Sequence, residues 1–366
     1  MREYLLVFVV AAVITYAATP FVRWLALVTG AMTAVRDRDI HTFPTPRLGG
    51  VAILLGFVAA LLVASRLPYL SQIFQGGEMM GVLIGAVIVC SVGVLDDIRE
   101  LDWLTKLAGQ MLAAGVMAFQ GVQLLSLPLF GVTVLPAPLL VAITILIVVI
   151  SANAVNFIDG LDGLAAGVVG IAGLAFFGYS YLLSRTYDPP NVFSSATFIT
   201  AALVGCCLGF LPNNFHPARL FMGDSGSLML GLLLAAATIS MTGSIDPSAQ
   251  VGGNAAVAIL LPVVLPLAIM SLPLLDVLLA VVRRTRAGRR PWHPDAQHLH
   301  HRMLQIGHTH VQAVLVLYLW AAVVALGAVS FAFVEGWLPI VAIVVVALSA
   351  MILTLWLPRW MPDRRS

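Results

Sequence analysis

The chain has 366 residues, of which 60% are hydrophobic and 10% are charged, and its formal net charge is +2. Soluble globular domains carry roughly 25% charged residues. This composition therefore excludes an ordinary soluble protein and indicates that most of the surface faces hydrocarbon. The small net charge gives no indication of a nucleic-acid partner. The three cysteines lie in apolar stretches without metal-ligand spacing, so we expect neither disulfides nor a zinc site at Cys90, Cys206 and Cys207.

In chain order, apolar runs long enough to cross a bilayer follow one another from end to end. Because about 20 apolar residues span a bilayer as a helix, we predict an all-α polytopic membrane protein with about eleven transmembrane helices in one domain, residues 1–366. The expected spans are 4–28, 49–66, 79–95, 105–120, 135–152, 163–183, 194–211, 225–242, 254–282, 312–334 and 337–358. The ninth contains three prolines and is expected to be kinked or broken. The first lacks a convincing cleavage site and is expected to be retained.

The distribution of Lys and Arg predicts the orientation. An odd number of spans places the termini on opposite sides, and 16 of the 19 Lys and Arg residues then fall on one face, leaving Arg2, Arg66 and Arg185 on the other. Under the positive-inside rule the crowded face is cytoplasmic, so the N-terminus is expected outside and the C-terminus in the cytoplasm, across the inner (plasma) membrane. All eight histidines fall on the same face. We therefore expect the functional site on the cytoplasmic loops.

The stretch GVLDDIRELDWLTKLAGQ, residues 93–110, closes the third span and opens the fourth. Adjacent carboxylates at Asp96 and Asp97 repel each other unless a cation or a proton relieves them. Lys106, the only lysine in the chain, could supply that charge. The competing interpretation ends one helix with the Asp pair and caps the next with Asp102; the adjacency of the two carboxylates favours function.

The stretch NAVNFIDGLDGLAAG, residues 153–167, repeats polar residues every three positions. This spacing places Asn153, Asn156 and Asp159 along one side of a helical turn. Amide and carboxylate oxygens in that arrangement suit a hard cation such as Mg²⁺, or hydrogen bonds to a polar ligand. For Asp162 alone, an ordinary N-cap role remains open.

The stretch NNFHPARLFMGDSGS, residues 213–227, joins the seventh and eighth spans. Asp224 and Ser225 lie between glycines at the predicted start of a helix, where backbone N–H groups favour anions. An aspartate beside such donors can hold a metal ion that in turn holds a phosphate. A simple N-cap role for Asp224 is equally compatible with this motif on its own.

The longest cytoplasmic loop, residues 283–311, contains PDAQHLHHRM after a basic run. Its dense donor cluster could bind phosphate or metal and consists of His298, His300, His301 and Arg302. Zinc is disfavoured because no cysteine joins the cluster. The basic run is most simply a positive-inside anchor that attracts anionic lipid, and nucleic acid is disfavoured because no aromatic residues are interleaved with it. In PRLGG, Arg47 could bind a phosphate or anchor the chain at the interface.

Together these five stretches resemble the polyprenyl-phosphate N-acetylhexosamine-1-phosphate transferase family over nearly the whole chain. The DD pair, the NxxNxxDG stretch, FMGDSGS and HLHH occur in the family's order and on its cytoplasmic loops. PRLGG and HLHH are similar to the branch that transfers N-acetylglucosamine 1-phosphate. The phospho-MurNAc-pentapeptide transferases, the alternative branch, typically carry three consecutive histidines, which Leu299 interrupts here.

The resemblance implies transfer of N-acetylglucosamine 1-phosphate from UDP-GlcNAc to undecaprenyl or decaprenyl phosphate, with release of UMP, as the first membrane step of envelope polysaccharide synthesis. It implies Mg²⁺, with Mn²⁺ as the alternative ion, held by Asp224 and Asn156. The expected catalytic residues are Asp96, Asp97 and Lys106. The expected substrate-binding residues are Arg47, Asn153, Asp159, Asp162, Asn214, His298, His300, His301 and Arg302.

Two further questions stay open at the level of sequence. A homodimer is compatible with the resemblance. The competing class is an ion-coupled secondary transporter, whose coupling carboxylates usually lie near the membrane midplane. Here only Asp276 falls well inside a span, so the sequence favours the enzyme.

Overall fold

The computed structural model describes residues 1–32, 45–124, 136–186, 194–243, 299–334 and 336–360, and also residues 278, 282, 283, 285, 286 and 288 as single positions. Within these ranges the regular secondary structure is helical, apart from an isolated bridge between Met32 and Pro46. Eight of the described helices are long and apolar enough to cross a membrane. The structure therefore agrees with an all-α polytopic membrane protein.

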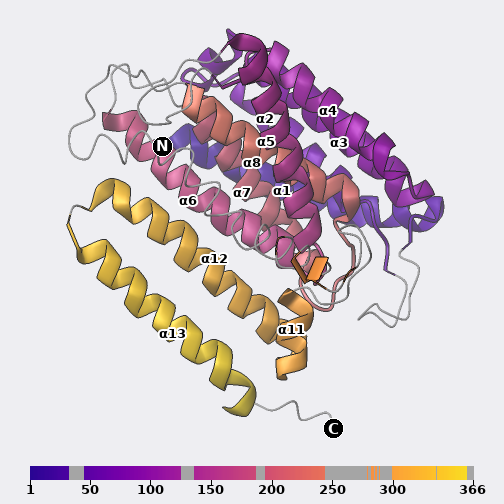
Figure 1. Cartoon of the computed structure of the whole chain (residues 1–366). Coiled ribbons are helices and arrows are strands. Elements are labelled where there is room, and N and C mark those ends of the chain that lie inside the picture. The colour runs from indigo at the N-terminus through magenta and orange to yellow at the C-terminus, as the bar shows by residue number, and fades with distance from the viewer. Residues whose placement is uncertain are drawn as a thin grey trace.

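The chain forms helices from its first residues to near its end (Figure 1). They are α1 Arg2–Thr29, α2 Gly49–Ala64, η1 Leu70–Phe74, α3 Glu78–Arg99, α4 Trp103–Phe119, α5 Ala137–Ile158, α6 Leu164–Thr186, α7 Ser194–Asn214, α8 Gly223–Gly243, α11 Leu299–Ile306, α12 His310–Phe333 and α13 Leu338–Trp360. Of these, η1 is a short 3-10 helix, and α2 is apolar but only 16 residues long.

Ten of the eleven expected spans coincide with helices of the structure. The span expected at 254–282 lies outside the described residues except for single positions, so the count of eleven stays a prediction. The fifth span was expected to end at residue 152, whereas α5 continues to Ile158. An asparagine can continue a helix when its side chain finds a partner, and Asn153 Nδ2 donates to Val149 O at 2.8 Å. The predicted loop 283–311 contains the short helix α11.

Helix α8 forms the centre of the bundle and is packed against α3, α5, α7 and α2. Its sequence is apolar on every side, as expected for a helix surrounded by protein. Every residue in its most apolar stretch is buried, against 17% in the corresponding stretch of α13. At the edge of the bundle, α12 packs on α6 and α13 packs on α12 (Figure 1).

Long helices that alternate in direction bring their ends together at two opposite faces of the bundle. At one face, Asp97 near the end of α3 contacts the first residues of α8, as does Asn156 near the end of α5. We call this face the Asp224 end. At the other face, Glu3 at the start of α1 contacts the residues before η1. The N-terminus lies at the side of the bundle away from α11 in Figure 1.

Candidate active site

The start of α8 rests on the backbone of the PRLGG segment. Phe221 N donates to Pro46 O at 2.8 Å, Gly49 N donates to Phe221 O at 3.0 Å and Gly50 N donates to Met222 O at 3.0 Å. A Cβ on Gly50 would overlap the backbone of Ser225, so glycine is required for this close approach. These contacts fix where the first turn of α8 begins.

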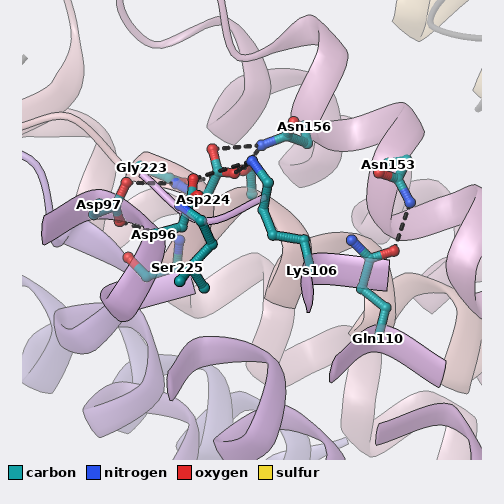
Figure 2. Close-up of polar contacts among 11 residues, drawn as sticks. Asp96, Asp97, Lys106, Gln110, Asn153, Asn156, Gly223, Asp224 and Ser225 are labelled. Atoms are coloured by element: carbon teal, nitrogen blue, oxygen red, sulfur yellow. Dashed lines mark hydrogen bonds and ion pairs between the residues drawn. The ribbon is translucent and has the colours of Figure 1, made fainter. Parts of the chain in front are cut away.

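Asp97 supplies the anion that the N-terminus of α8 favours. Its Oδ1 accepts from Asp224 N at 3.0 Å and its Oδ2 accepts from Ser225 N at 3.2 Å (Figure 2). The carboxylate therefore pairs with two of the N–H groups that a helix leaves without partners in its first turn. Gly223 has a φ of +69°, and a Cβ there would overlap the Asp97 carboxylate. The anion predicted at this helix start thus comes from α3.

Lys106 joins two carboxylates on different helices. Its Nζ lies 3.1 Å from Asp96 Oδ2 and 3.1 Å from Asp224 Oδ2 (Figure 2). Asp96 Oδ1 also accepts from Leu101 N at 2.7 Å, which ties the end of α3 to the turn before α4. Asp102 caps α4 by accepting from the backbone N–H groups of its first turn. The charge expected from Lys106 therefore reaches Asp96, whereas Asp97 makes a separate set of contacts.

The two asparagines of α5 face this cluster one turn apart. Asn156 Nδ2 donates to Asp224 Oδ1 at 2.9 Å and to Ser227 Oγ at 2.9 Å. Asn153 Nδ2 donates to Gln110 Oε1 on α4 at 2.6 Å, as Figure 2 shows. Asn153 and Asn156 share a face of α5, as expected, whereas Asp159 follows the last residue of the helix. Asn156 contacts Asp224 on α8, and Asn153 contacts Gln110 on α4. We call Asp96, Lys106, Asn156 and Asp224 the Lys106 cluster.

The donor set around Asp224 fits a hard divalent cation. Carboxylate, amide and hydroxyl oxygens are the ligand types that Mg²⁺ prefers. In the Lys106 cluster two carboxylates share a single ammonium, which leaves an excess of negative charge for a cation to balance. Asn156 directs its amide nitrogen at Asp224, and rotation of the amide would present Oδ1 there instead. Asp224 and Asn156 are therefore suited to hold such an ion.

Asp159 follows the last residue of α5 and is partly buried. Burial raises the pKa of its carboxyl to about 7, the Asp224 carboxylate adds to this, and the Arg47 guanidinium opposes it. Asp159 is thus coupled electrostatically to Asp224 and to Arg47. This places two of the expected substrate-binding residues in the electrostatic surroundings of the Lys106 cluster.

Asp162 belongs to a different group of contacts. Its Oδ2 lies 2.8 Å from His216 Nδ1 and accepts from Ala218 N at 3.1 Å, and its backbone N donates to His310 Nε2 at 3.2 Å. The two imidazoles stack with centroids 4.4 Å apart and an interplanar angle of 16°. The three side chains lie close enough for a metal ion, but imidazole binds metals in the plane of the ring. Two stacked rings do not direct their nitrogens at one ion between them, so we describe this group as a structural contact that joins the turn before α6, the loop 215–222 and the start of α12.

The structure places the remaining predicted residues less centrally. Asn214 is buried and its Nδ2 donates to Leu220 O at 3.0 Å, so it holds the loop before α8. Arg302 lies exposed on α11. His300 and His301 lie on α11 with only their backbone described, and His298 lies outside the described residues. The convergence of the histidine cluster with Asp224 therefore stays a prediction.

Four contact residues were not assigned from the sequence, namely Gln110, Ser227, His216 and His310. Helical spacing could have indicated the first two. Gln110 is four residues after Lys106 and Ser227 is three residues after Asp224, so each shares a helix face with a predicted site residue. The two histidines join Asp162 across 54 and 148 residues of sequence, and no local pattern signals such pairing.

Comparison with known proteins shows which family the chain resembles. Residues 79–242, which include the whole Lys106 cluster, match the model of glycosyl transferase family 4. The decaprenyl-phosphate N-acetylglucosaminephosphotransferase of Mycolicibacterium smegmatis is 45% identical over 97% of this chain and 88% of its own length. The protein of the same name from Mycobacterium tuberculosis is 45% identical, with 91% of this chain and 83% of that protein covered. The probable undecaprenyl-phosphate N-acetylglucosaminyl 1-phosphate transferase of Bacillus subtilis is 29% identical, with 96% and 92% covered.

Proposed function

The chain belongs to the polyprenyl-phosphate N-acetylhexosamine-1-phosphate transferase family, in its N-acetylglucosamine branch, and from this premise we propose that it transfers N-acetylglucosamine 1-phosphate from UDP-GlcNAc to a polyprenyl phosphate. The observation that carries the proposal is the Lys106 cluster, which gathers side chains from α3, α4, α5 and α8 at one end of the bundle. The names of the 45% identical relatives favour decaprenyl phosphate as the acceptor.

In the proposed reaction, an oxygen of the polyprenyl phosphate attacks the phosphorus bonded to the sugar. The bond from that phosphorus to the bridging oxygen of UMP breaks, so the products are polyprenyl diphospho-N-acetylglucosamine and UMP. Both reactants are anions, and the lipid phosphate has a second pKa of about 6 if it behaves as other phosphomonoesters do. Catalysis therefore consists mainly of neutralising and aligning charge.

We propose that Asp224 and Asn156 hold Mg²⁺, with Mn²⁺ as the alternative ion. A bound divalent cation would neutralise charge on the diphosphate. Lys106 contributes a charge of the chain's own. Its ammonium has three N–H donors, and two of them are directed at Asp96 and Asp224. The third can donate to a phosphate oxygen while the two carboxylates hold the side chain in place.

The two adjacent aspartates take separate roles in this proposal. Both oxygens of Asp97 accept from the backbone of α8, and the residue is only 7% exposed. Asp97 therefore positions Asp224, and Asp96 orients Lys106. Because the lipid phosphate is largely ionised at neutral pH, it needs no strong base. We accordingly propose direct attack, without an aspartyl-phosphate intermediate.

Isotope exchange tests the direct route. Labelled UMP incubated with the enzyme and UDP-GlcNAc, without a lipid acceptor, should give no labelled UDP-GlcNAc. Exchange at a rate comparable to turnover would show a covalent intermediate and contradict the roles given to Asp96 and Asp97.

We propose that the Asp224 end faces the cytoplasm across the inner membrane, on the support of the 16-to-3 distribution of Lys and Arg. Cysteine labelling tests this orientation, since the three native cysteines are buried. An Arg302→Cys variant should be labelled by an impermeant maleimide only after the cells are opened, whereas Arg66→Cys should be labelled from outside. The reverse pattern would overturn the orientation.

The activity itself is tested by UMP release from purified protein with Mg²⁺ and decaprenyl phosphate. UDP-GlcNAc, UDP-GalNAc and UDP-MurNAc-pentapeptide should be compared as donors, and we expect release with UDP-GlcNAc. Asp224→Asn should abolish release. Asp102→Asn is the matched control, because Asp102 is exposed at an N-cap that asparagine also satisfies. Release with the pentapeptide donor alone would assign the peptidoglycan branch instead.

A further inference from the structure

A cavity of about 460 Å³ lies at the end of the bundle opposite the Asp224 end. It is formed by the start of α1, the residue before η1 and the end of α6, and it is lined by Met1, Arg2, Glu3, Tyr4, Tyr69, Tyr181, Ser184 and Arg185. Its volume is within the range of roughly 300–1,000 Å³ typical of small-molecule sites. None of these residues belongs to the transfer site proposed above.

The cavity concentrates the few cations of this face. Only three Lys and Arg residues were assigned to the face opposite the site, and two of them, Arg2 and Arg185, line this one cavity. Neither forms an ion pair with any residue in the described part of the chain. The Arg185 guanidinium lies over the Tyr181 ring at 6.0 Å from its centroid, a contact with the ring face that leaves its N–H donors available.

The acidic residue of the cavity is already engaged. Glu3 Oε1 accepts from Tyr69 N at 3.1 Å and Glu3 Oε2 accepts from Leu70 N at 2.9 Å. Both carboxylate oxygens thus face the start of η1, where a negative charge is favourable. The side chains that line the cavity therefore keep a positive balance, two guanidinium groups against one carboxylate.

Tyr4 lines the cavity, but its hydroxyl is not exposed there. Tyr4 is 2% exposed, and its ring packs edge-on against Tyr69, Phe177 and Tyr181. Its hydroxyl is buried in the interior, where it interacts with the side chains of Ser194, Tyr69 and Thr197. The neighbouring Tyr69 hydroxyl is paired with Ser194 Oγ at 3.0 Å. The charged donors that this cavity offers to a ligand are therefore the guanidinium groups of Arg2 and Arg185.

We propose that this cavity binds a phosphate-bearing anion through Arg2 and Arg185. Guanidinium groups match the oxygens of phosphate with paired N–H donors. The phosphate can belong to an anionic phospholipid headgroup of the adjoining leaflet or to a soluble phosphate compound. The site lies beyond the proposed transferase function and takes no part in the transfer step.

The test compares lipid and soluble phosphate on the full-length protein. In the lipid arm, the protein is purified from nanodiscs of mixed phosphatidylglycerol and phosphatidylcholine, and retained lipid is counted by native mass spectrometry. In the soluble arm, thermal unfolding is followed with increasing glycerol 3-phosphate or inorganic phosphate. Retained phosphatidylglycerol identifies a lipid site, and a saturable stabilisation by soluble phosphate identifies the second source.

The variants are the double substitution Arg2→Gln with Arg185→Gln, and Arg66→Gln as the matched control from the same face outside the cavity. We expect at least a tenfold loss of binding in the double variant and no change in Arg66→Gln. Equal binding by wild type and the double variant, an equal loss in Arg66→Gln, or no binding in either arm would overturn the proposal.

Two readouts keep these outcomes interpretable. Unfolding temperatures measured without added phosphate establish that each variant is folded; where the double variant is not, Arg185→Gln alone is measured and should still lose binding. UMP release is recorded in parallel and should be unchanged. Because the binding measurement does not depend on UMP release, failure of the transferase proposal and failure of this one are distinguishable.

Discussion

The two ends of the bundle differ in whether their charged side chains have partners within the protein. At the Asp224 end, Asp96, Asp97 and Asp224 each contact an ammonium or backbone N–H group of another segment. At the other end, the guanidinium groups of Arg2 and Arg185 lack ion pairs with described residues. The first arrangement is assembled before any ligand arrives, as electrostatic catalysis requires. The second is suited to a ligand that completes it.

The largest effect is expected where the Asp224 end is most closely packed. Gly223→Ala should lower the rate of UMP release by more than about 100-fold, because the residue has a φ of +69° and its Cβ would displace the Asp97 carboxylate from the start of α8. Gly115→Ala is the control, since a Cβ there meets no atom. Full activity in Gly223→Ala would show that the Asp97 contact is dispensable.

Removing the ammonium should be nearly as damaging. Lys106→Met keeps the length of the side chain but leaves the Asp96 and Asp224 carboxylates facing each other without a counter-charge. We expect kcat to fall about 100-fold, equivalent to about 2.7 kcal/mol of barrier. Lys106→Arg should recover part of the rate. If Lys106→Met lowered only the affinity for UDP-GlcNAc and left kcat unchanged, the ammonium would have no role in the transfer step.

The two adjacent aspartates provide a sharper comparison. Asp97→Asn puts an amide N–H₂ against backbone N–H donors of α8, so it should lower both the unfolding temperature and activity. Asp96→Asn keeps an oxygen for Leu101 N and should lower activity with a smaller loss of stability. Thermal unfolding in detergent, measured beside UMP release, separates the two. Equal losses of stability would contradict the division of roles.

The smallest effect concerns Asp159 and depends on pH. Because its pKa is raised to about 7 in the folded protein from an ordinary value of 3.8, the folded state retains a proton that the unfolded state releases. Stability therefore falls as pH rises through this window. Asp159→Asn should raise the unfolding temperature at pH 8 with chelator present, by less at pH 5, and should leave it unchanged near pH 4. If the unfolding temperature rose by the same amount at every pH, burial of the Asp159 carboxylate would not be the cause.

Much of the fold follows from the sequence, because a long apolar run in a bilayer has few alternatives to helix. The errors lie at helix ends. Helix α5 continues six residues beyond its expected end because Asn153 and Asn156 find partners on α4 and α8. Those partners exist only in the folded bundle, so an apolar pattern alone could not place the boundary.

The sequence predicted which residues belong to the candidate site better than it predicted which of them contact one another. Spacing placed Asn153 and Asn156 on one face, and the single lysine was expected to serve the Asp pair. The separation of Asp96 from Asp97 depends on how the start of α8 meets α3, 127 residues away in sequence. The contacts of Asp162 with His216 and His310 likewise depend on tertiary packing. Local rules identify which side chains are polar, and only packing decides which of them meet.

The seating of α8 on α3 and on the PRLGG backbone has a consequence for biosynthesis. During synthesis α3 is made before α8. The Asp97 carboxylate therefore cannot form its hydrogen bonds to Asp224 N and Ser225 N until those residues have been synthesised. Until α8 enters the membrane beside α2 and α3, Lys106 can pair with Asp96 but not with Asp224. The Lys106 cluster therefore assembles only once α8 has entered the bundle, and a nascent chain halted before Gly223 lacks this cluster.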